Sequence, residues 1–432
     1  MEGKSNNTSH GDGSSVNEPR KRPNFFVLDG AMGTEIEERR PDLLPLGPMW
    51  SASVVHKEPS AVQSVHEAYV NAGADILLTS TYQINTKGCA TLGVAIPDLV
   101  DAAVRLLRNS ITPERTSATE QAKAKAKLDP SVKRRGASAV FAPLLYGIRD
   151  DPSKCPVLIG GSMSPYGSLA GYGQEYHGKY TVDETIIDEF YNQRVRAFID
   201  YTSDTPRPKV DFLMLETFPL LKEAVGVFSW LSHQRDGVLD TAPVCISFVS
   251  VLDGDRPSAD ADDAAVEEWW NSAESSIHLP DGNTYLQVLD TLMELRSPQL
   301  AGLGANCCSP LEVSVVASLL LKKKKKHVED PSLVLLLYSN SGEEFTEGEW
   351  RWRHKFERGS RLSKWKRGTV VPQQELRRMM LAADVDVQLC GLFAYQTLLQ
   401  RPEADDWLFD IVICGGCCRS NPKDIAKIRA LA

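Results

Sequence analysis

Three cysteines, placed just after two apolar runs, are the residues whose chemistry is most distinctive. Cys307 follows the apolar run 300–305, and Cys417 and Cys418 follow the last apolar run, 410–414. Thiolates are good ligands for zinc, and a catalytic zinc site uses three protein ligands and leaves a fourth position open. Adjacent cysteines rarely join to each other, because the ring they would close is strained. The spacing therefore predicts a metal site made by Cys307, Cys417 and Cys418.

Cys308 is an alternative ligand, because it is next to Cys307 in the same motif. We favour Cys307, which comes first after the strand end and should point inward, whereas Cys308 should pack below. A single cysteine in such a place is more often a small buried hydrophobic residue. Three cysteines at two strand-end turns favour the metal interpretation. The remaining cysteines lack a partner motif or lie inside a strand, and they are Cys89, Cys155, Cys245, Cys390 and Cys414.

Eight short apolar segments must position these cysteines. They are 25–28, 76–78, 156–159, 210–215, 244–248, 300–305, 333–337 and 410–414. Their apolar residues run almost continuously instead of alternating, which is typical of parallel strands buried on both faces. Helical patterns lie between them, so the sequence predicts an α/β fold, a (β/α)8 TIM barrel with loop insertions. The active site of such a barrel lies at the carboxyl ends of its strands.

Helix starts can also be read from the sequence. Thr181 with Glu184 has the spacing of a capping box, and Ser309-Pro310-Leu311-Glu312 is another expected helix start. Asn421 is expected to cap the last helix, with Pro422 in its first position and Asp424 in its first turn.

The chain is expected to form one barrel with additions. Residues 1–23 are polar and rich in Ser, Asn and Gly, which predicts a disordered N-terminal tail, and residues 24–432 would form the barrel. Three stretches look like insertions around the barrel, near 109–151, 251–279 and 341–372.

Composition excludes several classes of protein. The 432 residues are 42% hydrophobic and carry a formal net charge of −9, which gives no support to nucleic-acid binding. No run of 18 apolar residues occurs, so no membrane-spanning helix is expected. The nine cysteines do not suggest a secreted disulfide framework at this length, and a cytoplasmic protein with reduced thiols is predicted. The basic run 322–326 is interpreted as a solvated helix end.

Five motifs, taken together and in this order, resemble the homocysteine S-methyltransferases. They are Asp29-Gly30-Ala31-Met32-Gly33-Thr34, the stretch from Gly161 to Gly167, Glu216-Thr217, the stretch from Gly304 to Cys308, and Gly415-Gly416-Cys417-Cys418. The resemblance implies a (β/α)8 barrel and a Zn²⁺ cofactor whose thiolate ligands match Cys307, Cys417 and Cys418.

The resemblance also implies roles around the metal. Glu216 would hold the ammonium group of homocysteine, and Asp29 would also lie in that site, although capping of the next helix is an alternative for Asp29. Backbone amides near Gly161 and Ser162 are candidates to contact the substrate carboxylate. Trp50 is expected either to lie against a cationic methyl donor or to serve in packing. Weaker candidates, placed only by lying at strand ends, are Tyr82, Ser247 and Asn340.

The expected reaction follows from the chemistry of thiols. A thiol is largely protonated near neutral pH, and zinc bound by three thiolates would deprotonate a fourth sulfur. The prediction is zinc-dependent methyl transfer from an onium donor to L-homocysteine, giving L-methionine. S-methylmethionine is the favoured donor, with S-adenosylmethionine as a second sulfonium candidate. The alternatives are a betaine-dependent enzyme and a non-catalytic barrel that binds homocysteine or zinc.

Overall fold

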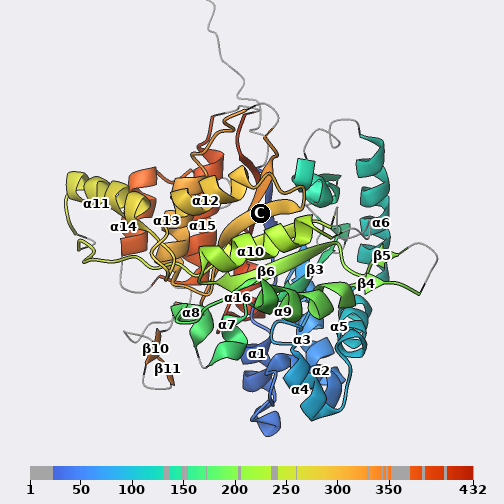
Figure 1. The fold of residues 1–432 in the computed structure, drawn as a ribbon. Coiled ribbons are helices and arrows are strands. Elements are labelled where there is room, and N and C mark those ends of the chain that lie inside the picture. The colour runs from blue at the N-terminus through green and yellow to red at the C-terminus, as the bar shows by residue number, and fades with distance from the viewer. Residues whose placement is uncertain are drawn as a thin grey trace, which may run out of the picture.

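Eight parallel strands form a single sheet that closes into a barrel (Figure 1). This computed structural model describes residues 23–431, apart from 130–135, 147–150, 152–153, 172, 203–205, 235–241, 259, 328–329, 343, 347–348, 352–369, 382–384 and 403–405. The strands are β1 (Phe25–Val27), β2 (Ile76–Leu78), β3 (Leu158–Met163), β6 (Phe212–Phe218), β7 (Val244–Phe248), β8 (Leu300–Asn306), β9 (Leu333–Ser339) and β12 (Phe409–Gly416). Their order is β1-β12-β9-β8-β7-β6-β3-β2, and a parallel bridge between Leu28 and Ile76 joins the two ends. The predicted (β/α)8 barrel is confirmed.

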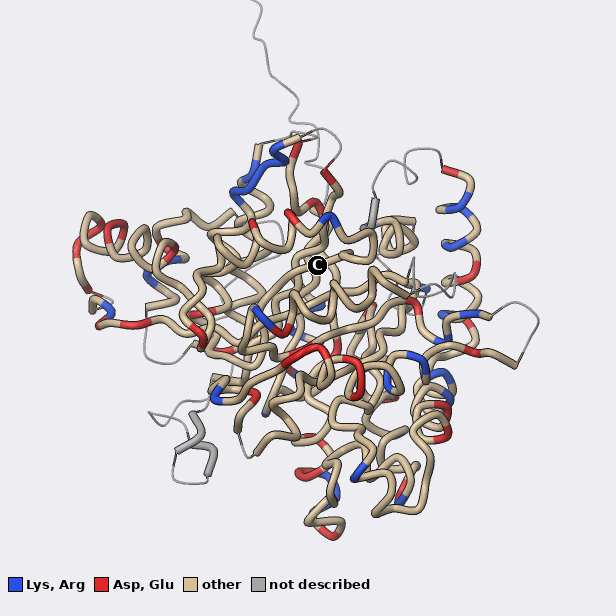
Figure 2. The backbone as a smooth tube through the Cα atoms, viewed as in Figure 1, with Lys and Arg blue, Asp and Glu red and all other residues tan. Residues whose placement is uncertain are grey.

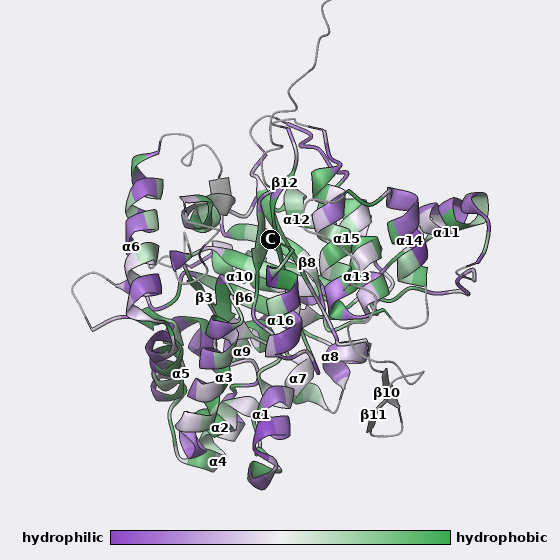
Figure 3. Ribbon diagram, turned by 180° about the vertical axis from the view of Figure 1, so that it is seen from behind, coloured by the Kyte–Doolittle hydropathy of each residue, from purple (hydrophilic) through white to green (hydrophobic). Residues whose placement is uncertain are grey.

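Helices surround the barrel and cover the outer face of the sheet, with apolar strands at the centre (Figure 3). Those of the first half are α1 (Gly33–Arg39), η1 (Pro41–Leu43), α2 (Ser51–Lys57), α3 (Pro59–Asn71), α4 (Thr86–Leu92), α5 (Ile96–Ser110), α6 (Pro113–Leu128), η3 (Gly136–Tyr146), α7 (Gly167–Ala170), α8 (Gln174–His177) and α9 (Glu184–Ala197). Those of the second half are α10 (Leu221–Ser232), α11 (Asp263–Ser276), α12 (Tyr285–Glu294), α13 (Pro310–Leu320), α14 (Gln373–Leu381), α15 (Val387–Leu399) and α16 (Pro422–Arg429). Two small antiparallel pairs, β4 (Ile199–Asp200) with β5 (Arg207–Pro208) and β10 (Glu344–Thr346) with β11 (Glu349–Arg351), lie outside the barrel.

The helix starts predicted from the sequence agree with the structure, with one correction. The capping boxes at Ser309 and Asn421 are both present. The capping box predicted for Thr181 and Glu184 is wrong, because Asp183 caps α9 by accepting a hydrogen bond from the amide of Ile186 at 2.9 Å. A carboxylate one residue before the helix is as good a cap as a hydroxyl, and its position fits the start of α9.

Several strands are longer than their apolar runs. β3, β6, β9 and β12 continue into the polar motifs that follow 159, 215, 337 and 414. The first residues of these motifs therefore lie inside hydrogen-bonded strands, where their side chains have fixed directions, and the cysteines follow directly after β8 and β12. This rigidity suits residues that must form a precise site.

The predicted insertion near 109–151 packs under the barrel as well as around it. Within it, η3 brings Phe141 and Leu144 into the same buried cluster as the residues that fill the barrel interior, among them Phe212. The rings of Phe141 and Phe212 have centroids 5.0 Å apart, and Phe212 is the first residue of β6. This segment therefore closes the amino-terminal end of the barrel, opposite the end that carries the motifs.

We expect Phe141→Ala to destabilise the protein by about 3–5 kcal/mol, because it would empty a fully buried aromatic site. Leu128→Ala is the matched control in the same insertion, since Leu128 is 83% exposed and should cost almost nothing. Urea unfolding of both variants checks the prediction. Equal midpoints for the two variants would contradict a role of η3 in closing the barrel.

The other two predicted insertions differ from each other. The stretch 251–279 contains α11, and its ends meet through a bridge between Val251 and His278. The stretch 341–372 contains the β10–β11 pair, but residues 352–369 lie outside the described part of the chain. The predicted tail also lies outside it, except for Pro23.

Charged residues of both signs are spread over the helices and loops (Figure 2). Within the described ranges, no helix is both long enough and apolar enough to cross a membrane.

Candidate active site

Three sulfur atoms meet at the carboxyl ends of β8 and β12. The sulfur atoms of Cys307, Cys417 and Cys418 all lie within 4.8 Å of one another, and those of Cys307 and Cys418 are 3.9 Å apart. Three thiolates placed tetrahedrally around one zinc at 2.3 Å would be about 3.8 Å apart. In this structure Cys307 and Cys417 form a disulfide, with Cα atoms 5.5 Å apart. The donor set fits a metal ion once this pair is reduced.

Tight turns bring the two cysteine motifs together. Cys307 has a backbone φ of 52°, in the left-handed region, and its carbonyl accepts a hydrogen bond from the side chain of Asn340 at 3.2 Å. The amide of Cys417 donates to the carbonyl of Ser339 at 2.7 Å. A Cβ on Gly415 would lie 2.7 Å from the carbonyl oxygen of Asp29, so only glycine lets β12 approach this close to the turn after β1.

Cys308 faces away from the other sulfurs. It is buried in the main core, near Ser250, Glu312 and Cys390, and burial raises the pKa of its thiol well above the usual value. The left-handed turn at Cys307 separates the directions of the two side chains. Of the two adjacent cysteines, the structure places Cys307 in the sulfur cluster.

A hydrogen-bonded network links the sulfur cluster to Glu216. The side-chain amide of Asn306 contacts the sulfur of Cys417 at 3.8 Å, and its oxygen accepts from the hydroxyl of Ser247 at 2.8 Å. Ser247 is 2.5 Å from the hydroxyl of Tyr338, which is in turn hydrogen-bonded to Glu216. Side chains of the three strands β7, β8 and β9 thus hold the carboxylate of Glu216, on β6, in a fixed position.

Glu216 is a buried acid with an unusual protonation equilibrium. Burial raises its pKa to about 7, and hydrogen bonds from Ser162 and Tyr338 only partly oppose that rise. Asp29 is also buried, and burial raises its pKa well above the usual value. The charge of Glu216 raises the pKa of Asp29 further, whereas the amide of Leu78, which donates to Asp29 at 2.9 Å, lowers it. Two buried carboxylates that repel each other form a natural site for a cation.

The pKa of Glu216 predicts a pH-dependent stability. Between its unfolded value near 4.5 and about 7, the folded state keeps a proton that the unfolded state has released. The free energy of unfolding should therefore fall as pH rises through this window, by roughly 3 kcal/mol. Glu216→Gln should remove this slope, which urea unfolding of both proteins at pH 5, 6, 7 and 8 would show. Parallel stability curves for the two proteins would refute the prediction.

The other residues predicted to contact the substrate have different surroundings in the structure. Asp29 is not a helix cap, because α1 is capped by Met32 without a side-chain hydrogen bond. Ser162 offers its hydroxyl to Glu216, but its amide already donates to Thr79 at 3.1 Å. Gly161 lies within β3, and its Cα faces the ring of Phe198 in the helical layer. The predicted contact between these amides and the substrate carboxylate would require Ser162 to release Thr79.

Trp50 covers the turn after β1. A Cβ on Gly33 would lie 2.2 Å from its indole ring, so the ring rests directly on that glycine. The indole nitrogen donates to Glu37 at 2.6 Å. Glu37 is one of the two acids whose charges raise the pKa of Cys418, so Glu37, with Trp50 hydrogen-bonded to it, lies within electrostatic reach of that sulfur.

Two tyrosines, Tyr176 and Tyr82, lie near Cys418, and the sequence analysis did not single out Tyr176. Tyr176, on α8, has its hydroxyl 3.9 Å from the sulfur of Cys418. Tyr82, a weak candidate from sequence, is hydrogen-bonded to Thr217 and lies within electrostatic reach of Glu216 and Cys418. Burial raises the pKa of Cys418 to about 11, so this thiol ionises near neutral pH only if a positive charge is brought to it.

Asn306, Tyr338, Glu175 and Tyr176 were not predicted as site residues, for two different reasons. Asn306 and Tyr338 stand at strand ends beside residues that were singled out, so the pattern of strand-end polar residues could have found them. Tyr176 and its neighbour Glu175 lie on a short helix in a glycine-rich loop, where no periodic pattern marks an inward-facing side chain.

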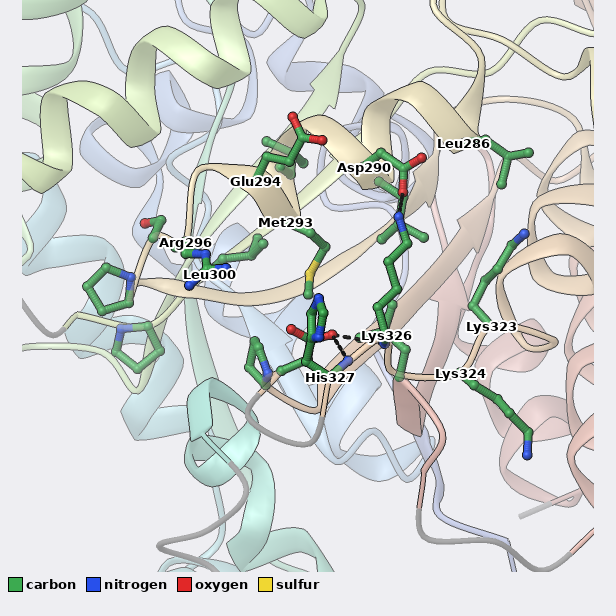
Figure 4. Close-up of a pocket in the computed structure, with 18 of the residues that line it drawn as sticks. Leu286, Asp290, Met293, Glu294, Arg296, Leu300, Lys323, Lys324, Lys326 and His327 are labelled. Carbon is green, nitrogen blue, oxygen red and sulfur yellow. Dashed lines mark hydrogen bonds and ion pairs between the residues drawn. The ribbon is translucent and has the colours of Figure 1, made fainter.

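A separate cavity of about 960 Å³ lies at the opposite end of the barrel (Figure 4). Its lining includes Leu300 at the start of β8 and Leu408 just before β12. Lys326 pairs with Asp290 at 2.8 Å, and the amide of His327 donates to Asp330. Because it opens at the amino-terminal ends of the strands, this cavity takes no part in the sulfur site.

Comparison with known proteins agrees with this geometry. The family model described as homocysteine S-methyltransferase matches residues 26–432. The chain is 25% identical over 413 residues to the homocysteine S-methyltransferase of Escherichia coli (strain K12), covering 95% of this chain and 96% of the relative. It is 27% identical over 329 residues to homocysteine S-methyltransferase YbgG of Bacillus subtilis (strain 168), covering 76% and 81%.

A solved structure has the same fold. The metallated form of the homocysteine methyltransferase MmuM from Escherichia coli superposes with a TM-score of 0.56 at 22% identity, covering 95% of this chain and 97% of that chain. The family match over nearly the whole chain, together with the barrel and its motifs, leads to one conclusion: this chain belongs to the homocysteine S-methyltransferase family.

Proposed function

We propose that this protein is a zinc-dependent enzyme that transfers a methyl group from a sulfonium donor to L-homocysteine and releases L-methionine. The observation that carries this proposal is the cluster of three sulfur atoms, linked by Asn306 and Tyr338 to a buried acid. Thiolates without a fourth protein ligand leave room for the sulfur of a substrate.

The buried acids suit the amino group of homocysteine. Glu216 and Asp29 lie close enough to affect each other's charge, and an incoming ammonium would neutralise that repulsion. Ser162 and Tyr338 donate to Glu216 and fix the direction of its carboxylate. The amino acid would thus be held at one end by this pair while its thiol reaches the sulfur cluster.

Cys307, Cys417 and Cys418 would hold the zinc ion. Bound there, zinc would supply a Lewis acid that lowers the pKa of the homocysteine thiol. The thiol proton passes to solvent, and the sulfur attacks the methyl carbon in line with the carbon–sulfur bond of the donor. That bond breaks with its electron pair left on the donor sulfur, which becomes a neutral thioether. Asn306 contacts the sulfur of Cys417 and would help to fix the direction of that ligand.

S-methylmethionine is the donor we favour, followed by S-adenosylmethionine. A betaine donor is the second candidate, because the betaine-homocysteine S-methyltransferase of Drosophila melanogaster is 27% identical to this chain over 335 residues, covering 76% of this chain and 82% of the relative. A non-catalytic barrel that binds homocysteine or zinc is the alternative from another class.

A donor panel with metal analysis tests the proposal. Reduced, zinc-loaded protein is incubated with homocysteine and S-methylmethionine, S-adenosylmethionine or betaine, and methionine is measured. Methionine formed fastest with S-methylmethionine, at one zinc per chain, is the expected result. Product with betaine alone would change the donor, and no product with any donor would favour the non-catalytic barrel.

A further inference from the structure

A buried carboxylate next to Tyr176 in the chain has one oxygen atom without a hydrogen-bond partner among the described residues. Glu175, on α8, is 9% exposed, and its Oε2 atom is shielded from solvent and has no hydrogen-bond partner within the described residues. The helix α8 packs against β6, the strand that carries Glu216. A buried charged group without a partner is costly, and proteins retain such a group mainly where a ligand completes the site.

The neighbours of Glu175 define what could complete the site. Its charge acts on Tyr82, Tyr176 and Cys418, so the carboxylate lies within electrostatic reach of two aromatic side chains and of one of the sulfurs. The hydroxyl of Tyr176 is 3.9 Å from the sulfur of Cys418. The charged side chains that act most strongly on this sulfur are Glu175 and Glu37, both acidic.

Tyrosine side chains and a carboxylate close to one another favour a cationic ligand. We infer that Glu175 binds the positive charge of the methyl donor, with Tyr82 and Tyr176 beside it, and so selects donors of net positive charge over zwitterionic ones. This inference rests on the proposed function and names the residue that sets donor choice. In the proposed function the ammonium group of homocysteine binds at Glu216 and Asp29, whose hydrogen bonds to Ser162, Tyr338 and Leu78 do not involve Glu175.

Glu175 would distinguish methyl donors by their net charge. S-methylmethionine has a sulfonium, an ammonium and one carboxylate, so its net charge is +1. Betaine and dimethylsulfonioacetate each have one cationic centre and one carboxylate, so their net charge is zero. A carboxylate beside the donor attracts the first molecule and repels the acid group of the other two.

The Glu175→Gln variant tests the inference. Its Kd for S-methylmethionine, measured by calorimetry on reduced, zinc-loaded protein without homocysteine, should rise about 10- to 100-fold. The KM for S-methylmethionine should rise in parallel, while the KM for homocysteine and the zinc content should stay within twofold of wild type. The KM for dimethylsulfonioacetate should change less. The variant should therefore prefer S-methylmethionine over dimethylsulfonioacetate less strongly than the wild type does. Glu175→Asp, which keeps the charge, should restore part of the affinity.

Glu189→Gln is the matched control, because it removes the same charge from an exposed position on α9 and should leave both donor constants unchanged. An unchanged Kd and KM for S-methylmethionine in Glu175→Gln would overturn this inference and leave the proposed function standing. A lower unfolding temperature or lost zinc in Glu175→Gln would also overturn it, because Glu175 would then have a structural role. Wild-type protein that forms no methionine with any donor would overturn the proposed function together with the inference.

Discussion

Cys307→Ser is expected to lose its bound zinc and to lower kcat by at least about a thousandfold. A serine hydroxyl is a poor zinc ligand, and two thiolates hold the ion far more weakly than three. The side chain is small and lies at a strand end, so the barrel should remain folded. Metal content by emission spectrometry, circular dichroism and methionine formation together check this result.

Cys308→Ser is the matched control for that experiment. Cys308 is adjacent in sequence but buried in the core, away from the other sulfurs. It should keep one zinc per chain and lose some stability, because a hydroxyl replaces a thiol in an apolar site. If Cys308→Ser lost the metal and Cys307→Ser kept it, the assignment of ligands would be reversed. The wild type and Cys308→Ser must be kept reduced, since Cys307 and Cys417 can form a disulfide with each other.

Glu216→Gln is expected to raise the KM for homocysteine about 50- to 100-fold, the cost of losing a charged hydrogen bond to the substrate ammonium. Glutamine keeps the shape of the side chain, so Ser162 and Tyr338 should retain a partner. The KM for the methyl donor should hardly change, because the positive charge of the donor is expected to bind at Glu175 and not at Glu216.

The Glu216 variant has a second, opposite consequence. The buried carboxylate of the wild type has its pKa raised to about 7, so its charged form opposes folding near pH 8. Glu216→Gln should therefore bind substrate poorly and yet unfold at a higher urea concentration than wild type. An unaltered homocysteine KM would show that the ammonium group binds elsewhere.

Short-range patterns determined the architecture from the sequence. Continuous apolar runs predicted the eight strands, and the caps at Ser309 and Asn421 predicted two helix starts, because the required contacts lie within a few residues. The carboxyl ends of parallel strands share one rim, so the same reasoning gathered Cys307, Cys417 and Cys418 at one place.

Only the tertiary structure decided the features that depend on distant residues. The left-handed turn at Cys307 accepts a hydrogen bond from Asn340, just after the neighbouring strand β9; this turn directs the Cys307 side chain toward the cluster and Cys308 into the core. The sequence could not show that η3 closes the barrel, since Phe141 is buried only against strands brought together by the complete sheet. Glu175 likewise lies on the short helix α8, which shows no periodic pattern, and the burial of its unpaired Oε2 atom exists only in the folded chain. Composition and spacing thus set the elements and their chemistry, while packing between distant segments fixed which side chains face the site.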